Sequence, residues 1–133
     1  MEILAGTAAL ARWYRRYLQR CNEHDFDRLD EFVAPDVEVN GAAPGLSTYV
    51  RGLRDVVNAF PDYHWGLRHL FVDGAWLSAH FVDTGTHRGP FLGILPTGRA
   101  VRTQEFAIYR IEDAKIADVW VAADNLGILD QLR

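Results

Sequence analysis

The hydrophobic period of the chain changes near Pro61, and this change limits the possible folds more than any other feature. Before Pro61, apolar residues recur at helical spacing over residues 7–23 and 46–60. After it, apolar and polar residues alternate, as in strands with one buried face. Helices followed by an antiparallel sheet predict an α+β domain, and the 133 residues fit a single domain over 1–133.

The first half is predicted to contain three helices and one short strand. Thr7 is the expected N-cap of the first helix and Asp25 that of the second. Pro35 and Pro61 should end the second and third helices, because proline cannot continue a helix. The predicted helices cover residues 7–23, 25–33 and 46–60, and the strand covers 37–40.

The second half is predicted to be mostly strand. Asp73-Gly74 and Asp113-Ala114 have the composition of tight turns, and the alternation slips near His69, which indicates a bulge. Four long strands can curl around the first helix as a cone, leaving a pocket between the concave face and the helices. The predicted strands cover residues 63–72, 75–87, 101–112 and 116–121, followed by a helical turn over 126–132.

Glu105 is the strongest candidate for chemistry inside that pocket. The odd positions of the strand 101–111 are the more apolar, so they should face inward, taking Glu105 with them and leaving Gln104 outside. Asp83 and His87 have inward parity on the preceding strand. Carboxyl and imidazole groups in one apolar cavity would have shifted pKa values suited to proton transfer. Alternatively, Asp83 and His87 lie at the frayed, solvated end of the hairpin.

Aromatic residues make up 12% of the chain, within a hydrophobic fraction of 49%. They can pack the core, line a cavity for a flat apolar ligand, or do both. Asn40 could add a hydrogen bond to such a ligand. The aromatic candidates for the cavity wall are Trp13, Tyr17, Tyr49, Phe60, Trp65 and Trp120.

Several functional classes lack their sequence signals. The net charge is −4 with no basic stripe, which argues against nucleic-acid binding, and no 18-residue apolar run indicates a membrane span. The stretch 1–10 does not resemble a signal peptide, and the single Cys21 cannot form an internal disulfide, so a cytoplasmic location is expected. The histidines show no metal-binding spacing, and no nucleophile elbow or phosphate loop appears. Cofactor-independent acid–base chemistry remains.

Several motifs resemble those of the SnoaL-like polyketide cyclase family, and together they cover most of the chain. The most specific is a hairpin rich in glycine and proline, Thr84-Gly-Thr-His-Arg-Gly-Pro-Phe-Leu-Gly-Ile-Leu-Pro-Thr-Gly-Arg99. The resemblance implies the nuclear transport factor 2-like fold, which agrees with the cone. The further matches are the segments 35–37, 60–62, 108–116 and 120–132.

The resemblance also implies a mechanism that this chain cannot use unchanged. The family's ring-closing cyclases perform an intramolecular aldol reaction without metal or cofactor, with an Asp as the acid–base residue and a Gln and a His in support. Those three positions correspond to Val121, Glu105 and Ala107 here. Valine cannot move a proton, so Glu105 and Asp124 are the candidates to replace the missing Asp. Asp124 could instead be the N-cap of the terminal helix.

The sequence therefore predicts a cofactor-independent enzyme of secondary metabolism that cyclises or isomerises a polyketide-like or other apolar carbonyl or epoxide substrate. The expected partners are a small aromatic or polycyclic ligand and further copies of the chain, in a homodimer or homotetramer. The alternative is a non-catalytic ligand-binding or dimerisation module of the same fold, or a protein that assists hydroxylation. The fold alone does not decide between them.

Overall fold

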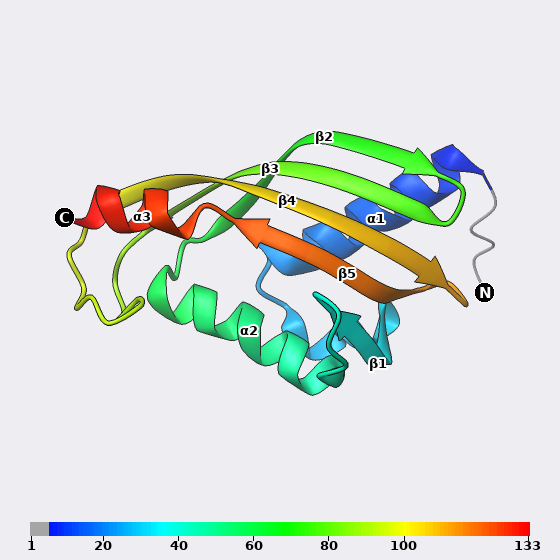
Figure 1. The fold of residues 1–133 in the computed structure, drawn as a ribbon, viewed down its shortest axis with the longest axis horizontal. Helices are drawn as coiled ribbons and strands as arrows, with labels where there is room; N and C mark the ends of the chain where they lie inside the picture. The colour runs from blue at the N-terminus through cyan, green and yellow to red at the C-terminus, as the bar shows by residue number, and fades with distance from the viewer. Residues whose placement is uncertain (1–5) are drawn as a thin grey trace.

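The computed structural model describes residues 6–133 and shows a curved five-stranded sheet in the order β1-β5-β4-β3-β2 (Figure 1). The stretch 1–10, whose sequence does not resemble a signal peptide, lies partly outside the described residues. None of the helices in 6–133 is long and apolar enough to cross a membrane. The elements are α1 (Thr7–Asn22), η1 (Phe26–Glu31), β1 (Val33–Val39), α2 (Gly45–Ala59), β2 (His64–Asp73), β3 (Trp76–Thr86), β4 (Ala100–Glu112), β5 (Lys115–Ala123) and α3 (Asn125–Leu132).

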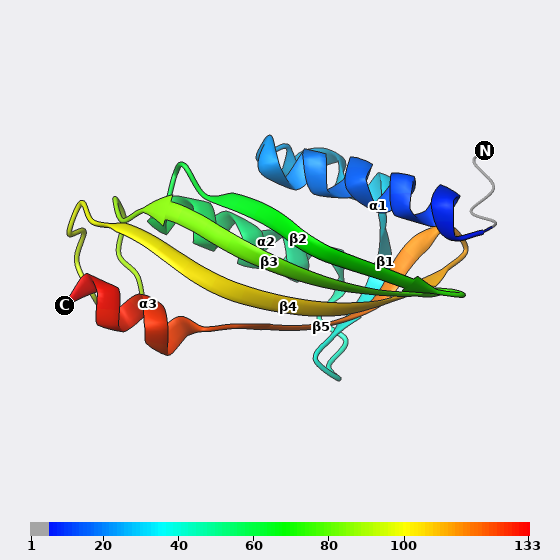
Figure 2. The ribbon, with the colours of Figure 1, turned by 90° about the horizontal axis from the view of Figure 1, so that it is seen from above.

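The α+β class and the curved sheet with N-terminal helices are confirmed. Strands β2 to β5 form an antiparallel meander, and the sheet does not close into a barrel. The long helix α1 runs along one face of this sheet (Figure 2). Its buried side faces the strands and forms much of the core through Leu10, Trp13, Tyr14, Tyr17, Leu18 and Cys21.

The predicted start of α1 is wrong by one residue. Gly6 occupies the N-cap position and Thr7 is the first helical residue, with no side-chain hydrogen bond capping the helix. Gly6 has a φ of 85°, a conformation that glycine adopts without the steric cost of a Cβ atom. The chain therefore turns into the helix through backbone geometry rather than through a threonine cap.

The predicted second helix is shorter than expected, because a strand begins inside it. The 3-10 helix η1 follows Asp25, which makes no side-chain cap, and β1 starts at Val33 instead of at residue 37. Pro35 therefore lies within a strand rather than at a helix end. Its missing N–H is tolerated because β1 is an edge strand that pairs only with β5, in parallel. Val33 and Val37 are fully buried and fix this strand against the core.

The strand half follows the predictions closely. The bulge lies between Leu67 and His69, as the slip in alternation indicated. Asp113 and Ala114 form the turn between β4 and β5 with φ values of 51° and 60°. Two successive residues with positive φ are typical of the hairpin turn whose twist matches that of the strands. Strand lengths differ from the predictions by only one or two residues at most ends.

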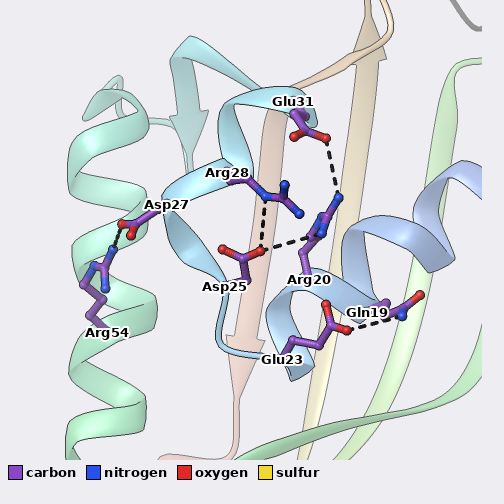
Figure 3. Close-up of polar contacts among 8 residues, drawn as sticks. All are labelled: Gln19, Arg20, Glu23, Asp25, Asp27, Arg28, Glu31 and Arg54. Carbon is purple, nitrogen blue, oxygen red and sulfur yellow. Dashed lines mark hydrogen bonds and ion pairs between the residues drawn. The ribbon is translucent and has the colours of Figure 1, made fainter.

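Ion pairs hold η1 between α1 and α2 (Figure 3). Arg20 of α1 contacts Asp25 at 3.6 Å and Glu31 at 3.8 Å, and Arg54 of α2 pairs with Asp27. Arg28 adds a contact to Asp25 at 3.3 Å, and Gln19 donates a hydrogen bond to Glu23 at 3.4 Å. Pairs this exposed contribute about 0–1 kcal/mol each, so they orient the connection more than they stabilise the fold.

Candidate active site

A cavity of about 300 Å³ lies between the helices and the inward faces of the strands. Its wall is mainly apolar and aromatic, which suits a small, flat ligand. Among the described residues that line it, none is basic. Five predicted site residues contribute to the wall: Tyr17, Tyr49, Phe60, Trp65 and Glu105.

Glu105 places the only carboxyl group among the described lining residues in this cavity. It is partly buried in the middle of β4, with the inward parity that its strand pattern predicts. Burial raises the pKa of Glu105 to about 10, and the neighbouring Asp83 carboxyl adds to the rise. A hydrogen bond from the Trp65 side chain partly opposes it. At neutral pH Glu105 therefore carries a proton.

Asp83 lies on β3, behind the cavity wall, and is completely buried. Its Oδ2 accepts a hydrogen bond from the Tyr63 hydroxyl at 2.9 Å. Its Oδ1 is buried without a donor among residues 6–133. Burial raises the pKa of Asp83, whereas its hydrogen bonds with Glu105 and Tyr63 lower that pKa.

The two carboxyl groups satisfy each other only if they hold a proton between them. Two ionised carboxylates would both be acceptors, and Asp83 would keep an orphaned oxygen. A proton on Glu105 makes it a donor toward Asp83, which matches the raised pKa of Glu105. Carboxyl groups in such contact ionise one at a time. The pair is therefore a carboxyl dyad in which Glu105 holds a proton at neutral pH.

His87 is buried but does not line the cavity. Its Nδ1 accepts a hydrogen bond from the Thr97 backbone N–H at 3.1 Å, and its backbone N–H donates to Arg99 at 2.9 Å. These contacts close the loop between β3 and β4, which carries Phe91 to the cavity. Both Asp83 and His87 are 0% exposed, so the alternative of a solvated hairpin end is wrong for both.

Besides Asp83 and His87, four more predicted site residues do not line the cavity. Trp13 packs against Phe32 in the core, with ring centroids 5.7 Å apart. Trp120 is 40% exposed on the opposite face of the sheet, because its neighbours Val119 and Val121 take the inward positions of β5. The four residues that therefore do not contribute to the cavity wall with Glu105 are Trp13, Trp120, Asn40 and Asp124.

Asn40 and Asp124 serve the backbone instead. The Asn40 side-chain oxygen accepts a hydrogen bond from the Val121 N–H at 2.9 Å, which ties the end of β1 to β5. The exposed Asp124 is the N-cap of α3, and its Oδ1 accepts from the Gly127 N–H at 2.9 Å. The N-cap interpretation of Asp124 is thus confirmed.

Tyr63 and Tyr109 are site residues that the sequence reasoning did not single out. Tyr63 lines the cavity and reaches Asp83, while Tyr109 lines it four residues beyond Glu105 on β4. The sequence already indicates that both face inward, because Tyr63 has the same strand parity as Trp65 and Tyr109 has the same parity as Glu105. Their hydroxyl partners lie on other elements, so pattern alone could not find them.

The three positions that the resemblance relates to catalysis lie side by side. Ala107 pairs with Val121 across β4 and β5, and Glu105 pairs with Ala123. Val121 lines the same cavity as Glu105, two residues along β5 from the cross-strand partner of Glu105. A carboxyl group at 105 therefore faces the same space as a side chain at 121, from the neighbouring strand.

Comparisons with known proteins agree with this architecture. A nogalonic acid methyl ester cyclase from Streptomyces nogalater is 30% identical over 118 residues, covering 80% of this chain and 84% of the relative. A SnoaL-like polyketide cyclase from Agrobacterium tumefaciens superposes with a TM-score of 0.83 at 34% identity, covering 93% and 98% of the two chains. TsrD from Streptomyces laurentii superposes with a TM-score of 0.87 at 28% identity, covering 98% of both chains.

The family model described as SnoaL-like polyketide cyclase matches residues 11–132, nearly the whole chain. The cavity, the curved sheet and the position of Glu105 beside the expected acid position fit this match. The chain belongs to the SnoaL-like polyketide cyclase family.

Proposed function

We propose that this protein is a cofactor-independent cyclase of secondary metabolism that closes a ring by an intramolecular aldol reaction, with the Asp83–Glu105 dyad as its acid–base group. The observation that carries the proposal is a single carboxyl group, that of Glu105, among the described residues lining an apolar cavity, backed by a fully buried Asp83. The raised pKa of Glu105 agrees with it. Two carboxyl groups that share one proton can both accept and donate a proton, and an aldol closure needs both.

The proton movements balance within the dyad. When the shared proton lies on Asp83, the Glu105 carboxylate can remove a proton from the carbon next to a substrate carbonyl. The resulting enolate carbon attacks the second carbonyl, which forms the new carbon–carbon bond and an alkoxide. The alkoxide takes a proton back from Glu105, so the dyad ends with the single proton with which it began. Tyr63 holds the Asp83 carboxyl group in place through its hydrogen bond to Oδ2.

This cavity favours a substrate whose part inside the cavity is uncharged. The proposed dyad carries a negative charge when one of its carboxyl groups is ionised, and none of the described lining residues offers a compensating cation. Burying a carboxylate there would leave it without a partner, at a cost of several kcal/mol. A flat, apolar polyketide with carbonyl groups fits both the aromatic wall and this charge.

Kinetics of variants test the assignment, with nogalonic acid methyl ester as the first substrate, taken from the name of the bacterial relative. We expect Glu105→Gln to lower kcat/KM by roughly 100-fold or more, as for the loss of an acid–base group. Asp124→Asn is the matched control, because asparagine also caps helices, and it should stay near wild type. Full activity in Glu105→Gln would refute the dyad as the acid–base group.

A non-catalytic ligand carrier is the second candidate, favoured by the valine at position 121. It predicts that wild-type protein binds the ester without converting it, and that Glu105→Gln binds it equally well. Turnover by the wild type above the rate in buffer, lost in Glu105→Gln, rejects this candidate.

We also propose that the protein acts as a homodimer, joined through the outer face of its sheet. Phe71 on β2 and Phe106 and Ile108 on β4 are exposed there, with β3 between the two strands. Arg110 on the same face is paired with Asp118, so two copies of this face would not repel each other strongly. Light scattering of wild type and Phe106→Glu tests this: a dimer that the charge splits supports the proposal, and a monomeric wild type contradicts it. The cytoplasmic location stays a prediction.

A further inference from the structure

Four tyrosines form a second polar cluster at the cavity. The cluster lies toward the C-terminal end of β4, whereas Glu105 lies in the middle of that strand. Tyr14 donates a hydrogen bond to the Tyr109 hydroxyl at 2.9 Å, and the hydroxyls of Tyr17 and Tyr49 bond to each other. Tyr17, Tyr49 and Tyr109 line the cavity, while Tyr14 is completely buried behind them. The proposed aldol step uses none of these hydroxyls.

Counting hydrogens singles out Tyr109. Each hydroxyl has one hydrogen to donate, so each pair needs only one of its two hydrogens for its internal bond. Tyr14 donates its hydroxyl hydrogen to Tyr109, and the hydroxyl hydrogen of Tyr109 has no acceptor within residues 6–133. In the other pair, the Cys21 sulfur beside Tyr17 can accept the remaining hydrogen. Tyr109 is thus a buried donor whose only open direction is the cavity.

The chemistry of this donor selects a neutral oxygen acceptor. Burial raises the pKa of Tyr109 well above its ordinary value, so the phenol keeps its hydrogen at neutral pH. The hydrogen bond that Tyr109 accepts from Tyr14 polarises its own hydroxyl and makes it a better donor. Since no described lining residue is basic, the acceptor that suits this position is a carbonyl rather than a carboxylate.

The position of Tyr109 fixes where on the ligand that oxygen must lie. Glu105 and Tyr109 point the same way from β4 with Ala107 between them, and are roughly 13 Å apart along the strand at about 3.3 Å per residue. Val121 pairs with Ala107, so the stretch between the two polar ends is apolar. A ligand that reaches both ends must be long, flat and apolar in its middle.

We infer that Tyr109 is a positioning residue that donates a hydrogen bond to a ring carbonyl of the substrate, at the end remote from the reacting carbons. This contact favours a ligand with a ring carbonyl at the Tyr109 end over a ligand of the same frame that lacks it. The identity of the reacting end rests on the proposed function, but the binding of the carbonyl does not.

Two matched probes test the inference without turnover. 1-Aminoanthracene and 1-aminoanthraquinone share a three-ring frame and differ in the two ring carbonyls. The fluorescence of the first gives its Kd directly, and displacement gives the Kd of the second. We expect Tyr109→Phe to weaken 1-aminoanthraquinone roughly three- to tenfold, the loss of one hydrogen bond, and to change 1-aminoanthracene less than about twofold.

Tyr49→Phe is the control, because Tyr49 also lines the cavity but its hydroxyl pairs with Tyr17. It should affect both probes alike. Equal changes for the two probes in Tyr109→Phe, no change for either, or no binding of either probe to wild type would each overturn the inference. Asp124→Asn, which lies outside the cavity, should bind both probes as wild type does. A failure of the proposed chemistry then shows in the turnover of Glu105→Gln and leaves the Tyr109 result separate.

Discussion

The Tyr63 hydroxyl donates a hydrogen bond to Oδ2 of Asp83 at 2.9 Å, joining a cavity-lining side chain to a carboxyl group that no solvent reaches. This bond stabilises the charged form of Asp83, because a donor to a carboxylate lowers its pKa. In the proposed mechanism, the charge of the dyad therefore depends on a tyrosine that need not touch the reacting carbons.

Tyr63→Phe removes that donor from Oδ2 of Asp83. We expect a loss of unfolding free energy of about 1–3 kcal/mol, and a pKa of the dyad that rises further. The pH–rate profile of kcat/KM should shift to higher pH. Tyr14→Phe is the comparison variant, because it loses a buried hydroxyl that does not contact Asp83. An unchanged pH–rate profile in both variants would show that Tyr63 does not influence the reaction.

Stability should fall as pH rises toward alkaline values. Glu105 has a pKa of about 10 in the folded protein against an ordinary value of 4.5. Between these values the folded state binds more protons than the unfolded chain. Its contribution to stability is thus fully present below about pH 4.5 and is lost as pH rises to about 10, with a slope of at most about 1.4 kcal/mol per pH unit.

Urea unfolding of wild type and Glu105→Gln, at about pH 5.5 and about pH 8.5, measures this linkage. The wild type should lose stability over this interval. Glu105→Gln cannot titrate at position 105, so its dependence should be flatter. Parallel curves for the two proteins would show that Glu105 ionises normally.

Asp124 should matter for stability and not for turnover. Asp124→Ala removes the acceptor for the Gly127 N–H and should cost about 1 kcal/mol, whereas Asp124→Asn should cost far less. Both variants should keep kcat near wild type below their unfolding temperatures. A large fall in kcat for Asp124→Asn, with stability unchanged, would return Asp124 to the chemistry.

The acid group should be transferable to the neighbouring strand. Glu105→Gln/Ala107→His/Val121→Asp installs the three residue types that the family resemblance places at these positions. Since Ala107 and Val121 are cross-strand partners facing the cavity, the new pair can interact directly. We expect activity at least about tenfold above that of Glu105→Gln alone, as acid–base catalysis contributes this much or more. Glu105→Gln/Ala107→His, which lacks the Asp, should show no recovery.

Local pattern was enough for most of the fold and for part of the site. Strand alternation correctly placed Glu105 inside and Gln104 outside, and helical spacing identified the buried face of α1. The same alternation excludes Trp120 from the cavity, so that prediction failed by neglecting parity rather than for lack of signal. Pro35 was misleading because an edge strand tolerates the residue that ends a helix.

Non-local contacts decided the rest. Parity alone could not tell whether the end of β3 was solvated, and it is buried because the loop after it returns across His87 through Thr97. The Tyr63–Asp83 and Tyr14–Tyr109 bonds join residues 20 and 95 positions apart. Such partners depend on how elements pack, and a period along the chain carries no information about them.

The pairing of Glu105 with Ala123 and of Ala107 with Val121 has a consequence for how such proteins change over time. Because adjacent strands present side chains to one shared space, an ancestor could lose its acid from one strand after gaining another beside it. Lineages of this kind would keep their reaction while the residue that performs it moves. Judging a relative inactive from one missing aspartate would then overlook working enzymes, and the neighbouring inward positions should be read together.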